Sequence, residues 1–227
     1  MDIFGKALTD FFRKGQHDTL WLHNSYDGPE EMPIDIFFRT ESEMPDLEIE
    51  ALRLCKGTVL DIGAGVGSHS LHLQKQGFDV TAIDISGAAV NLMKERGVTN
   101  AINQDVFTVT ARFDTLLLLM NGIGLSGTLK GFENFLSKAK ELLNTDGQLI
   151  FDSSDISYLY EELPKPVNKY FGEISYQYEY QQQKGEWFDW LYLDQNTLLA
   201  ASTALGWNCE IVFEDENDQY LAKLTVK

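Results

Sequence analysis

The chain has 227 residues, 44% of them hydrophobic and 12% aromatic, which suffices for one well-buried α/β domain with a modest extension. Its 18 Lys and Arg residues stand against 35 Asp and Glu residues, and the formal charge of −17 opposes binding to nucleic acid or to an anionic membrane surface. Two cysteines without metal-ligand spacing exclude a disulfide framework and a zinc site. No apolar run is long enough to span a bilayer and the N-terminus lacks a secretory pattern, so we expect a cytoplasmic protein.

The first part of the chain is predicted to be a helical extension with a lid. Apolar residues recur at helical spacing within residues 3–12 and 47–54, which predicts two helices. Between them, residues 24–45 carry three prolines and many acids, which is typical of irregular chain lying across a surface.

Strands and helices alternate after residue 55. We expect strands at 58–62, 79–83, 101–103, 113–120 and 148–151, separated by helices at 68–75, 88–96 and 131–143. An antiparallel hairpin rich in Tyr and Trp is predicted at 174–182 and 186–193 around Lys184-Gly185, then a helix at 196–205 and strands at 207–214 and 220–226. This order predicts an α/β fold with a doubly wound, mostly parallel seven-stranded sheet, closed by an antiparallel C-terminal hairpin. The predicted domains are an extension, 1–54, and a main domain, 55–227, with the aromatic hairpin inserted at about 170–193.

The sequence Asp61-Ile62-Gly63-Ala64-Gly65-Val66-Gly67 lies between a predicted strand and a predicted helix. Glycines at such a turn let a ligand approach the backbone, and the helix N-terminus beyond them favours a negative group such as a carboxylate. The spacing also occurs in dinucleotide-binding folds, whose sixth motif position is Gly or Ala, whereas here it is Ser68. Asp61 suits a cofactor with a positive ammonium and sulfonium and would repel a pyrophosphate.

Two further acids follow the next two predicted strands. Asp84 ends the second strand, where a carboxylate can accept hydrogen bonds from both hydroxyls of a ribose, although an acid there is also typical of a helix N-terminus. Asp105 follows the third strand, where an acid and its backbone can meet an adenine amino group while Val106 or Phe107 packs on the ring. Alone, Asp105 fits a solvent-facing loop equally well.

In this order, residues 59–67, 80–86, 104–105 and 113–114 resemble the class I S-adenosylmethionine-dependent methyltransferase family, and residues 142–150, 206–207 and 220–222 look like its fifth-strand entry and C-terminal hairpin. The resemblance implies the Rossmann-like methyltransferase fold with S-adenosyl-L-methionine as cofactor. It also implies that Gly63 and Gly65 line the methionine moiety, that Asp84 holds the ribose and Asp105 the adenine, and that residues 120–122 face the sulfonium. The predicted cofactor-binding residues are Arg39, Asp61, Gly63, Ala64, Gly65, Gly67, Asp84, Ile85, Asp105, Val106, Met120 and Asn121.

The class of methyl acceptor can be narrowed by excluding reactions whose sequence motifs are missing. Methyl transfer is an in-line displacement that needs alignment and no catalytic triad. After the fourth strand the chain reads Asn121-Gly122-Ile123-Gly124, without the two prolines and aromatic that amino-methylating nucleic-acid enzymes of the family carry. Cys55 and Cys209 follow no proline near that strand, which excludes cytosine carbon methylation. We therefore expect O- or N-methylation of a small-molecule acceptor.

The hairpin supplies the candidate acceptor wall. Tyr176, Tyr178 and Tyr180 alternate on one strand face, and Trp187 and Trp190 follow in the facing strand, so their rings can hold a flat or cationic molecule. The same stripe is typical of hairpin core or of a contact in a homodimer.

Arg39 directly follows a bulky apolar run in the N-terminal segment. Its guanidinium can clamp a carboxylate of the cofactor or substrate, or pair at the surface with Glu41 or Glu43.

The histidines give no metal site. His69 and His72 are three residues apart on a predicted helix without a third ligand, so we expect surface or packing roles for them. His17 and His23, in the presumed lid, are candidate general bases.

Two other functions fit parts of the pattern. A nicotinamide-dependent oxidoreductase would be stabilised by NAD or NADP, and Asp61 and Ser68 oppose it. A non-catalytic S-adenosylmethionine-binding module would use the aromatic hairpin as a partner interface and would methylate nothing.

Overall fold

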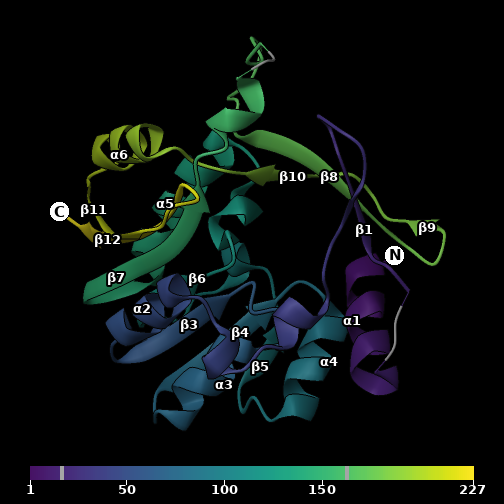
Figure 1. Cartoon of the computed structure of the whole chain (residues 1–227). Coiled ribbons are helices and arrows are strands. Elements are labelled where there is room, and N and C mark those ends of the chain that lie inside the picture. The colour runs from purple at the N-terminus through teal and green to yellow at the C-terminus, as the bar shows by residue number, and fades with distance from the viewer. Residues whose placement is uncertain (16–17, 162–163) are drawn as a thin grey trace.

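The structure is a computed structural model that describes residues 1–15, 18–161 and 164–227. In this part of the chain the larger sheet has seven strands, in the spatial order β11-β12-β7-β6-β3-β4-β5 (Figure 1). The first five along the chain are parallel, and β12 runs antiparallel to both β7 and β11, as predicted. The strands are β3 (Thr58–Ile62), β4 (Asp79–Asp84), β5 (Ala101–Asn103), β6 (Phe113–Leu118), β7 (Leu143–Ser154), β11 (Trp207–Glu214) and β12 (Gln219–Val226).

Helices cover both faces of this sheet, which explains the continuous apolar runs of its strands. Along β6, Leu116 and Leu118 pack on one face with α5, whereas Leu117 packs on the other face with α2 and α3. Ser86, Thr128 and Asp194 begin three of the helices by accepting a backbone hydrogen bond at the N-cap. The helices are α1 (Ile3–Lys14), α2 (Asp46–Leu54), α3 (Ser68–Lys75), α4 (Gly87–Arg96), α5 (Leu129–Leu142) and α6 (Gln195–Ala204), with short 3-10 helices η1 (Asp35–Phe38), η2 (Glu41–Glu43), η3 (Val106–Thr108), η4 (Gly122–Ser126) and η5 (Ser157–Tyr160).

A second, smaller sheet contains the predicted aromatic hairpin. It consists of β1 (Trp21–Asn24), β2 (Glu30–Glu31), β8 (Glu173–Tyr180), β9 (Gln183–Lys184) and β10 (Phe188–Leu191), in the order β10-β8-β1-β2 with β9 beside β8. β8 pairs with β10 as predicted, but its other edge pairs with β1. The prediction that residues 24–45 are irregular was therefore incomplete, because they include β2, η1 and η2.

The tight turn of this sheet also differs from the prediction. Gln181 and Gln182 turn the chain between β8 and β9 with φ of +50° and +61°, and Lys184-Gly185 lies beyond it. Two successive positive φ values define a type I′ turn, for which Asn and Gly are the usual signals. The glutamines give no such signal, so the sequence pointed to the wrong dipeptide.

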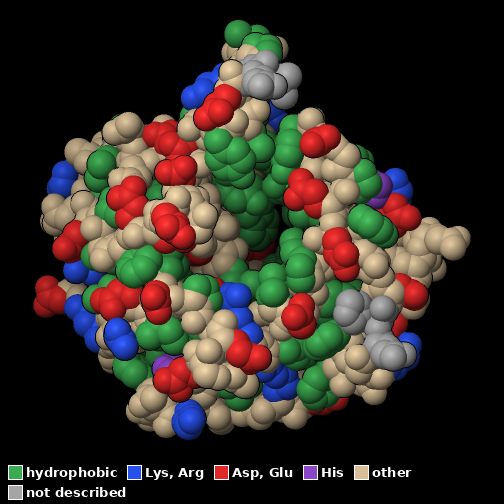
Figure 2. Space-filling model, viewed as in Figure 1, with side chains coloured by type: hydrophobic (Ala, Val, Ile, Leu, Met, Phe, Trp, Pro, Cys, Tyr) green, Lys and Arg blue, Asp and Glu red, His purple; other side chains and the backbone are tan. Residues whose placement is uncertain are grey.

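The second sheet lies across the carboxyl end of the parallel strands. β10 contacts η4, which follows β6, and β8 contacts α1, which itself packs on α4 (Figure 1). Figure 2 shows a deep hollow in this region, with hydrophobic side chains lining its interior. None of the described helices combines the length and apolar character needed to cross a membrane.

Candidate functional site

Residues 63–67, which we call the glycine turn, connect β3 to α3. One side of this turn is open and the other is packed against the protein. Gly63, Gly65 and Gly67 have φ of +70°, +56° and +80°, in the left-handed region that favours glycine. A Cβ on Gly65 would meet nothing within 4 Å, whereas a Cβ on Gly67 would lie 2.7 Å from Val98 and 3.0 Å from Met93. The prediction that all three glycines clear ligand space was wrong for Gly67, which lets the start of α3 pack on α4 and its following turn.

Asp84 ends β4 beside this turn. Its Oδ2 accepts a hydrogen bond from the Gly65 backbone N–H at 2.9 Å, and its Oδ1 accepts one from Ser86 N–H at 2.8 Å. Each oxygen keeps a lone pair for a further donor. Burial raises the pKa of Asp84 to about 6, and the nearby carboxylates of Asp2 and Asp61 add to the rise.

Next to Asp84, the segments that follow β4 and β5 expose apolar side chains. Ile85 is 81% exposed and Phe107 46% exposed. Asp105 caps η3 by accepting the Phe107 N–H at 2.9 Å, and it is otherwise exposed. Val106 is only 6% exposed and packs into the core, so of the two predicted ring-packing residues only Phe107 has a free face.

The turn after β6 is held by a carboxylate that sequence reasoning missed. Met120 and Asn121 have φ of +65° and +54°. Asp152, fully buried at the end of β7, accepts the Asn121 N–H at 2.9 Å and also bonds Gly122 N–H and Gln219. Burial raises the pKa of Asp152 to about 6. The only sequence signal was an acid directly after the apolar residues of β7.

Asp61 lies beneath the glycine turn. It is 2% exposed and accepts a hydrogen bond from Ser70 Oγ at 2.5 Å. Burial raises its pKa, and the His69 charge nearby opposes that rise. The carboxylate therefore ties β3 to α3 from below.

Arg39, Glu48 and His69 form a buried ionic cluster beside Asp61. Glu48 on α2 accepts hydrogen bonds from the Arg39 guanidinium and, at 2.8 Å, from His69 Nε2. The pKa of His69 is raised: desolvation lowers it, but the bond to Glu48 and the charge of Asp61 outweigh that effect. Arg39 Nε is buried without a hydrogen-bond partner among the described residues.

This cluster corrects two expectations. Arg39 pairs with Glu48, and neither of the surface acids predicted for it is its partner: Glu41 lies 3.3 Å from His72 and Glu43 caps Thr40. His69 has a buried ionic role and no surface role.

Of the two candidate bases of the lid, the structure describes only His23, and it lies away from the candidate site. His23 Nε2 lies 2.7 Å from Glu179. Glu179 alternates with Tyr178 and Tyr180 along β8, so this pair occupies the face opposite the tyrosines. His17 lies outside the described residues.

Five rings on one face of the second sheet form what we call the aromatic wall: Tyr176, Tyr178, Phe188, Trp190 and Tyr192. Phe188 lies opposite Tyr176, and their ring centroids are 6.2 Å apart. The predicted Trp187 precedes β10 and is 54% exposed, so Phe188 takes the place assigned to it. Tyr180 is fully buried against α1, with its hydroxyl 3.2 Å from Asp10.

The aromatic wall reaches both ends of the candidate site. The ring of Tyr178 stacks on Phe4 of α1 with centroids 5.2 Å apart. Burial raises the pKa of the Tyr178 hydroxyl, and the charges of Tyr192 and Asp84 add to the rise. At the other end, Trp190 packs so closely on η4 that a Cβ on Gly124 would overlap its indole nitrogen. The wall therefore spans from Asp84 to the turn after β6.

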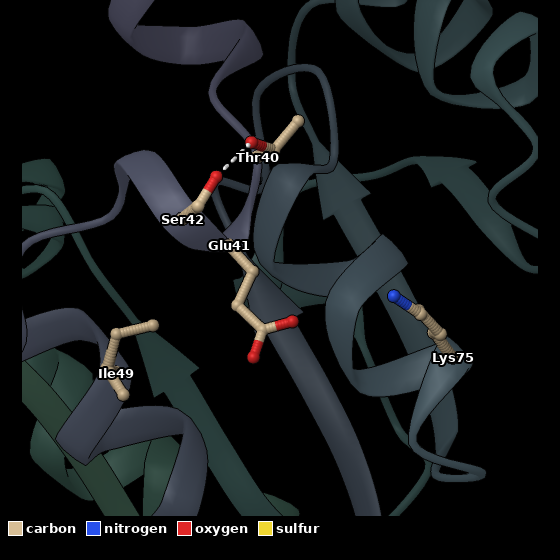
Figure 3. A pocket seen from close by; sticks show the side chains of 5 residues that line it. All are labelled: Thr40, Glu41, Ser42, Ile49 and Lys75. Atoms are coloured by element: carbon tan, nitrogen blue, oxygen red, sulfur yellow. Dashed lines mark hydrogen bonds between the residues drawn. The ribbon is translucent and has the colours of Figure 1, made fainter.

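A separate open depression of about 500 Å³ lies on another part of the surface, lined by Thr40, Glu41, Ser42, Ile49 and Lys75 (Figure 3). Lys75 ends α3, whereas the glycine turn precedes its first residue. No residue of the turn lines this depression, so we assign it no part in the candidate site.

Comparison with known proteins gives matches across the whole chain and over parts of it. The family model described as "Methyltransferase domain" matches residues 39–208. The crystal structure of an S-adenosylmethionine-dependent methyltransferase from Bacteroides fragilis, in complex with S-adenosyl-L-homocysteine, is 41% identical, with a TM-score of 0.91 over 99% of this chain and 94% of that chain. The CcbJ methyltransferase from Streptomyces caelestis has a TM-score of 0.64 at 11% identity over 83% of this chain and 99% of that chain, which shows the shared fold.

Among curated proteins, a 23S rRNA (uracil(747)-C(5))-methyltransferase from Pyrococcus horikoshii is 37% identical over 70 residues, which are 30% of this chain and 17% of that enzyme. The matches to curated relatives span less than half of the length of each relative.

Proposed function

The chain belongs to the class I S-adenosylmethionine-dependent methyltransferase family, and from this premise we propose that it methylates a small-molecule acceptor at oxygen or nitrogen by in-line displacement. S-Adenosyl-L-methionine is the cofactor. The observation that carries the proposal is the deep hollow of Figure 2, which lies between the carboxyl ends of the parallel strands and the second sheet with its aromatic wall. We also propose that residues 55–227 form the methyltransferase domain and that residues 1–54 extend it as a cover, which the pairing of β1 with β8 supports.

The residues at the carboxyl ends of β4 and β5 fit the nucleoside half of this cofactor. Asp84 would accept hydrogen bonds from the ribose hydroxyls through its remaining lone pairs. Ile85 and Phe107 would enclose the adenine, since both expose apolar surface beside Asp84, and Asp105 with the backbone at Val106 would meet its amino group.

The methionine half would lie along the glycine turn. The open space at Gly65 leaves room for it against the backbone of Gly63 and Ala64, and Gly67 supports the turn from behind. The buried Nε–H of Arg39 would pair with the cofactor carboxylate, while the charge of Asp61 would favour its ammonium. Met120 and Asn121, fixed by Asp152, would face the sulfonium.

The bound cofactor supplies a methyl group on a sulfonium that is ready to leave. The task of the protein is then to align the acceptor with that methyl and to exclude water. The aromatic wall and η4 would serve both roles, which the packing of Trp190 on η4 supports. We assign no general base.

Charge and cysteine chemistry favour a small acceptor over RNA. The formal charge of −17 opposes phosphate binding. Carbon methylation of a pyrimidine requires a thiolate nucleophile. Burial raises the pKa of Cys55 to about 12, and burial also raises the pKa of Cys209. The similarity to the rRNA enzyme covers only 30% of this chain.

A thermal-shift titration tests the cofactor assignment. S-Adenosylmethionine and S-adenosylhomocysteine should stabilise the protein, and NAD should not. Asp84→Ala should abolish the response, whereas Asp79→Ala, at the exposed start of the same strand, should retain it. An unchanged response in Asp84→Ala would refute the ribose role.

A screen of small amines, acids and phenols then tests the reaction. Methylation of one of them separates the proposed enzyme from a binding module and from an RNA-modifying enzyme. Transfer to RNA together with a blank small-molecule screen would refute the proposal.

A further inference from the structure

We propose that the aromatic wall and Glu30 form the acceptor subsite and that the acceptor is an amine, recognised as its ammonium ion. This inference rests on the proposed function and specifies its substrate class.

The rings of the wall are available to a ligand. Tyr178, Phe188, Trp190 and Tyr192 are all partly exposed, and the hollow beside the second sheet is lined by hydrophobic side chains (Figure 2). The wall also touches η4 through Trp190, next to the residues proposed to face the sulfonium. A molecule held against these rings therefore lies beside the group to be transferred.

A polar end adjoins the rings. The hydroxyls of Tyr176 and Tyr192 lie 3.2 Å apart. Tyr26, in the turn between β1 and β2, donates to Glu30 Oε1 at 3.0 Å, and Asn24 Nδ2 donates to the same atom at 2.9 Å. Oε2 of Glu30 has no hydrogen-bond partner in the described part of the chain and is open to a ligand.

The charge of Glu30 acts on the whole polar end. Burial is the main cause of the raised pKa of the Tyr26, Tyr176 and Tyr192 hydroxyls, and the charge of Glu30 adds to each rise, so this carboxylate is within electrostatic range of all three. An ammonium there would gain both this carboxylate and the negative faces of the rings, whereas an acceptor carboxylate would be repelled.

The wall lacks a cation of its own. Within the described residues, the cation–π contacts of the chain involve Phe38, Phe171, Tyr180 and Trp207, none of which belongs to the wall. In Figure 2 acidic side chains lie along the right side of the hollow and a basic one lies at its lower edge, and the formal charge of the whole chain is −17. A cationic molecule is complementary to the electron-rich rings, to the available carboxylate of Glu30 and to the net negative charge of the protein.

The transfer balances for an amine. The bound ammonium releases one proton to water, and the freed nitrogen lone pair forms the bond to the methyl carbon. The carbon–sulfur bond breaks at the same time and its electron pair stays on sulfur. The methylated product is again an ammonium ion.

A binding experiment tests recognition independently of turnover. The probes are benzyltrimethylammonium, which cannot be methylated, and its uncharged isostere neopentylbenzene. Calorimetry on the protein saturated with S-adenosylhomocysteine should show at least tenfold tighter binding of the cation. Glu30→Gln and Phe188→Leu should each weaken cation binding several-fold, whereas Glu31→Gln, the neighbouring exposed acid of β2, should not. Equal affinity for both probes, absence of cation binding, or equal effects of the two glutamate variants would overturn the proposal.

An activity experiment separates this inference from the proposed function. Phenethylamine, phenethyl alcohol and phenylpropionate are offered as acceptors of similar size. Methylation of the amine alone, with its Michaelis constant raised by Glu30→Gln and the affinity for S-adenosylmethionine unchanged, supports the inference. Methylation of the alcohol or the acid but not the amine refutes it and leaves small-molecule methylation standing. Methylation of RNA and of none of the three refutes both.

Discussion

Gly65 and Gly77 both lie at positive φ but have different surroundings. Both have positive φ, and a Cβ added at either would meet nothing within 4 Å, yet Gly65 lies in the glycine turn and Gly77 follows α3. Alanine at either position should cost about 1 kcal/mol, because the left-handed conformation disfavours a side chain. The two positions therefore separate backbone strain from loss of ligand space.

We expect Gly65→Ala to lower the affinity for S-adenosylmethionine at least tenfold, and Gly77→Ala to leave it unchanged. Denaturant unfolding should show similar losses of stability for the two variants, and calorimetry should show the difference in binding. Equal affinities in both variants would contradict the proposed path of the methionine moiety.

The raised pKa of Asp84 predicts how the affinity for the cofactor depends on pH. Its pKa is raised to about 6, and ribose hydroxyls donate to the ionised carboxylate. Affinity for S-adenosylmethionine should therefore be constant above neutral pH and fall as the pH drops below about 6. Calorimetry between about pH 5 and 8 measures this fall, and Asp84→Asn should bind weakly with a flatter profile.

The same group has the opposite effect on the stability of the cofactor-free protein. Because its pKa in the folded state, about 6, lies above the ordinary aspartate value of 3.8, the folded protein binds more protons in this interval. The contribution of Asp84 to stability is thus fully present below the unfolded-state pKa and is lost as the pH rises through about 6. The free energy of unfolding of wild type relative to Asp84→Asn should accordingly rise as the pH falls. A difference that is independent of pH would contradict the raised pKa.

At the scale of elements, the packing of β10 on η4 holds the aromatic wall in place beside the hollow. Gly124 makes the close approach possible, since a Cβ there would overlap Trp190. A side chain at this position must displace either the indole or the helical turn, and overpacking of this kind typically costs about 1–3 kcal/mol.

Gly124→Ala should therefore lower the stability by about 1–3 kcal/mol and raise the Michaelis constant for the acceptor more than that for S-adenosylmethionine. Gly28→Ala, in the turn between β1 and β2 of the same sheet, meets nothing within 4 Å and serves as the matched control. Wild-type stability and kinetics for Gly124→Ala would show that Trp190 does not depend on this contact.

At the scale of the whole molecule, the excess of acids governs which partners can approach. With a formal charge of −17, association with RNA should be weaker than the roughly 10⁻⁴ M limit of non-specific binding, even at low salt. Fluorescence anisotropy with a labelled single-stranded RNA measures this, and a basic RNA-binding domain serves as the positive control. Tight binding that weakens steeply with salt would contradict a small-molecule acceptor.

The sequence by itself determined the seven-stranded sheet and the strand ends that are proposed to hold the cofactor. Apolar runs such as Leu116 to Leu118, the glycines after β3 and the acid that ends β4 are local signals, because strand period, turn conformation and strand-end chemistry depend on neighbours in the chain. The family, the fold and the cofactor followed from these signals.

Only the tertiary structure decided which side chains face the hollow and which lie behind it. Asp61, Val106 and Gly67 belong to the predicted motifs but are buried, whereas Asp152 and Phe188 gain their places through partners on other elements. The pairing of β1 with β8 and the Arg39–Glu48–His69 cluster join residues far apart in the chain. No local pattern records such contacts, because they form only when packing brings separate elements together.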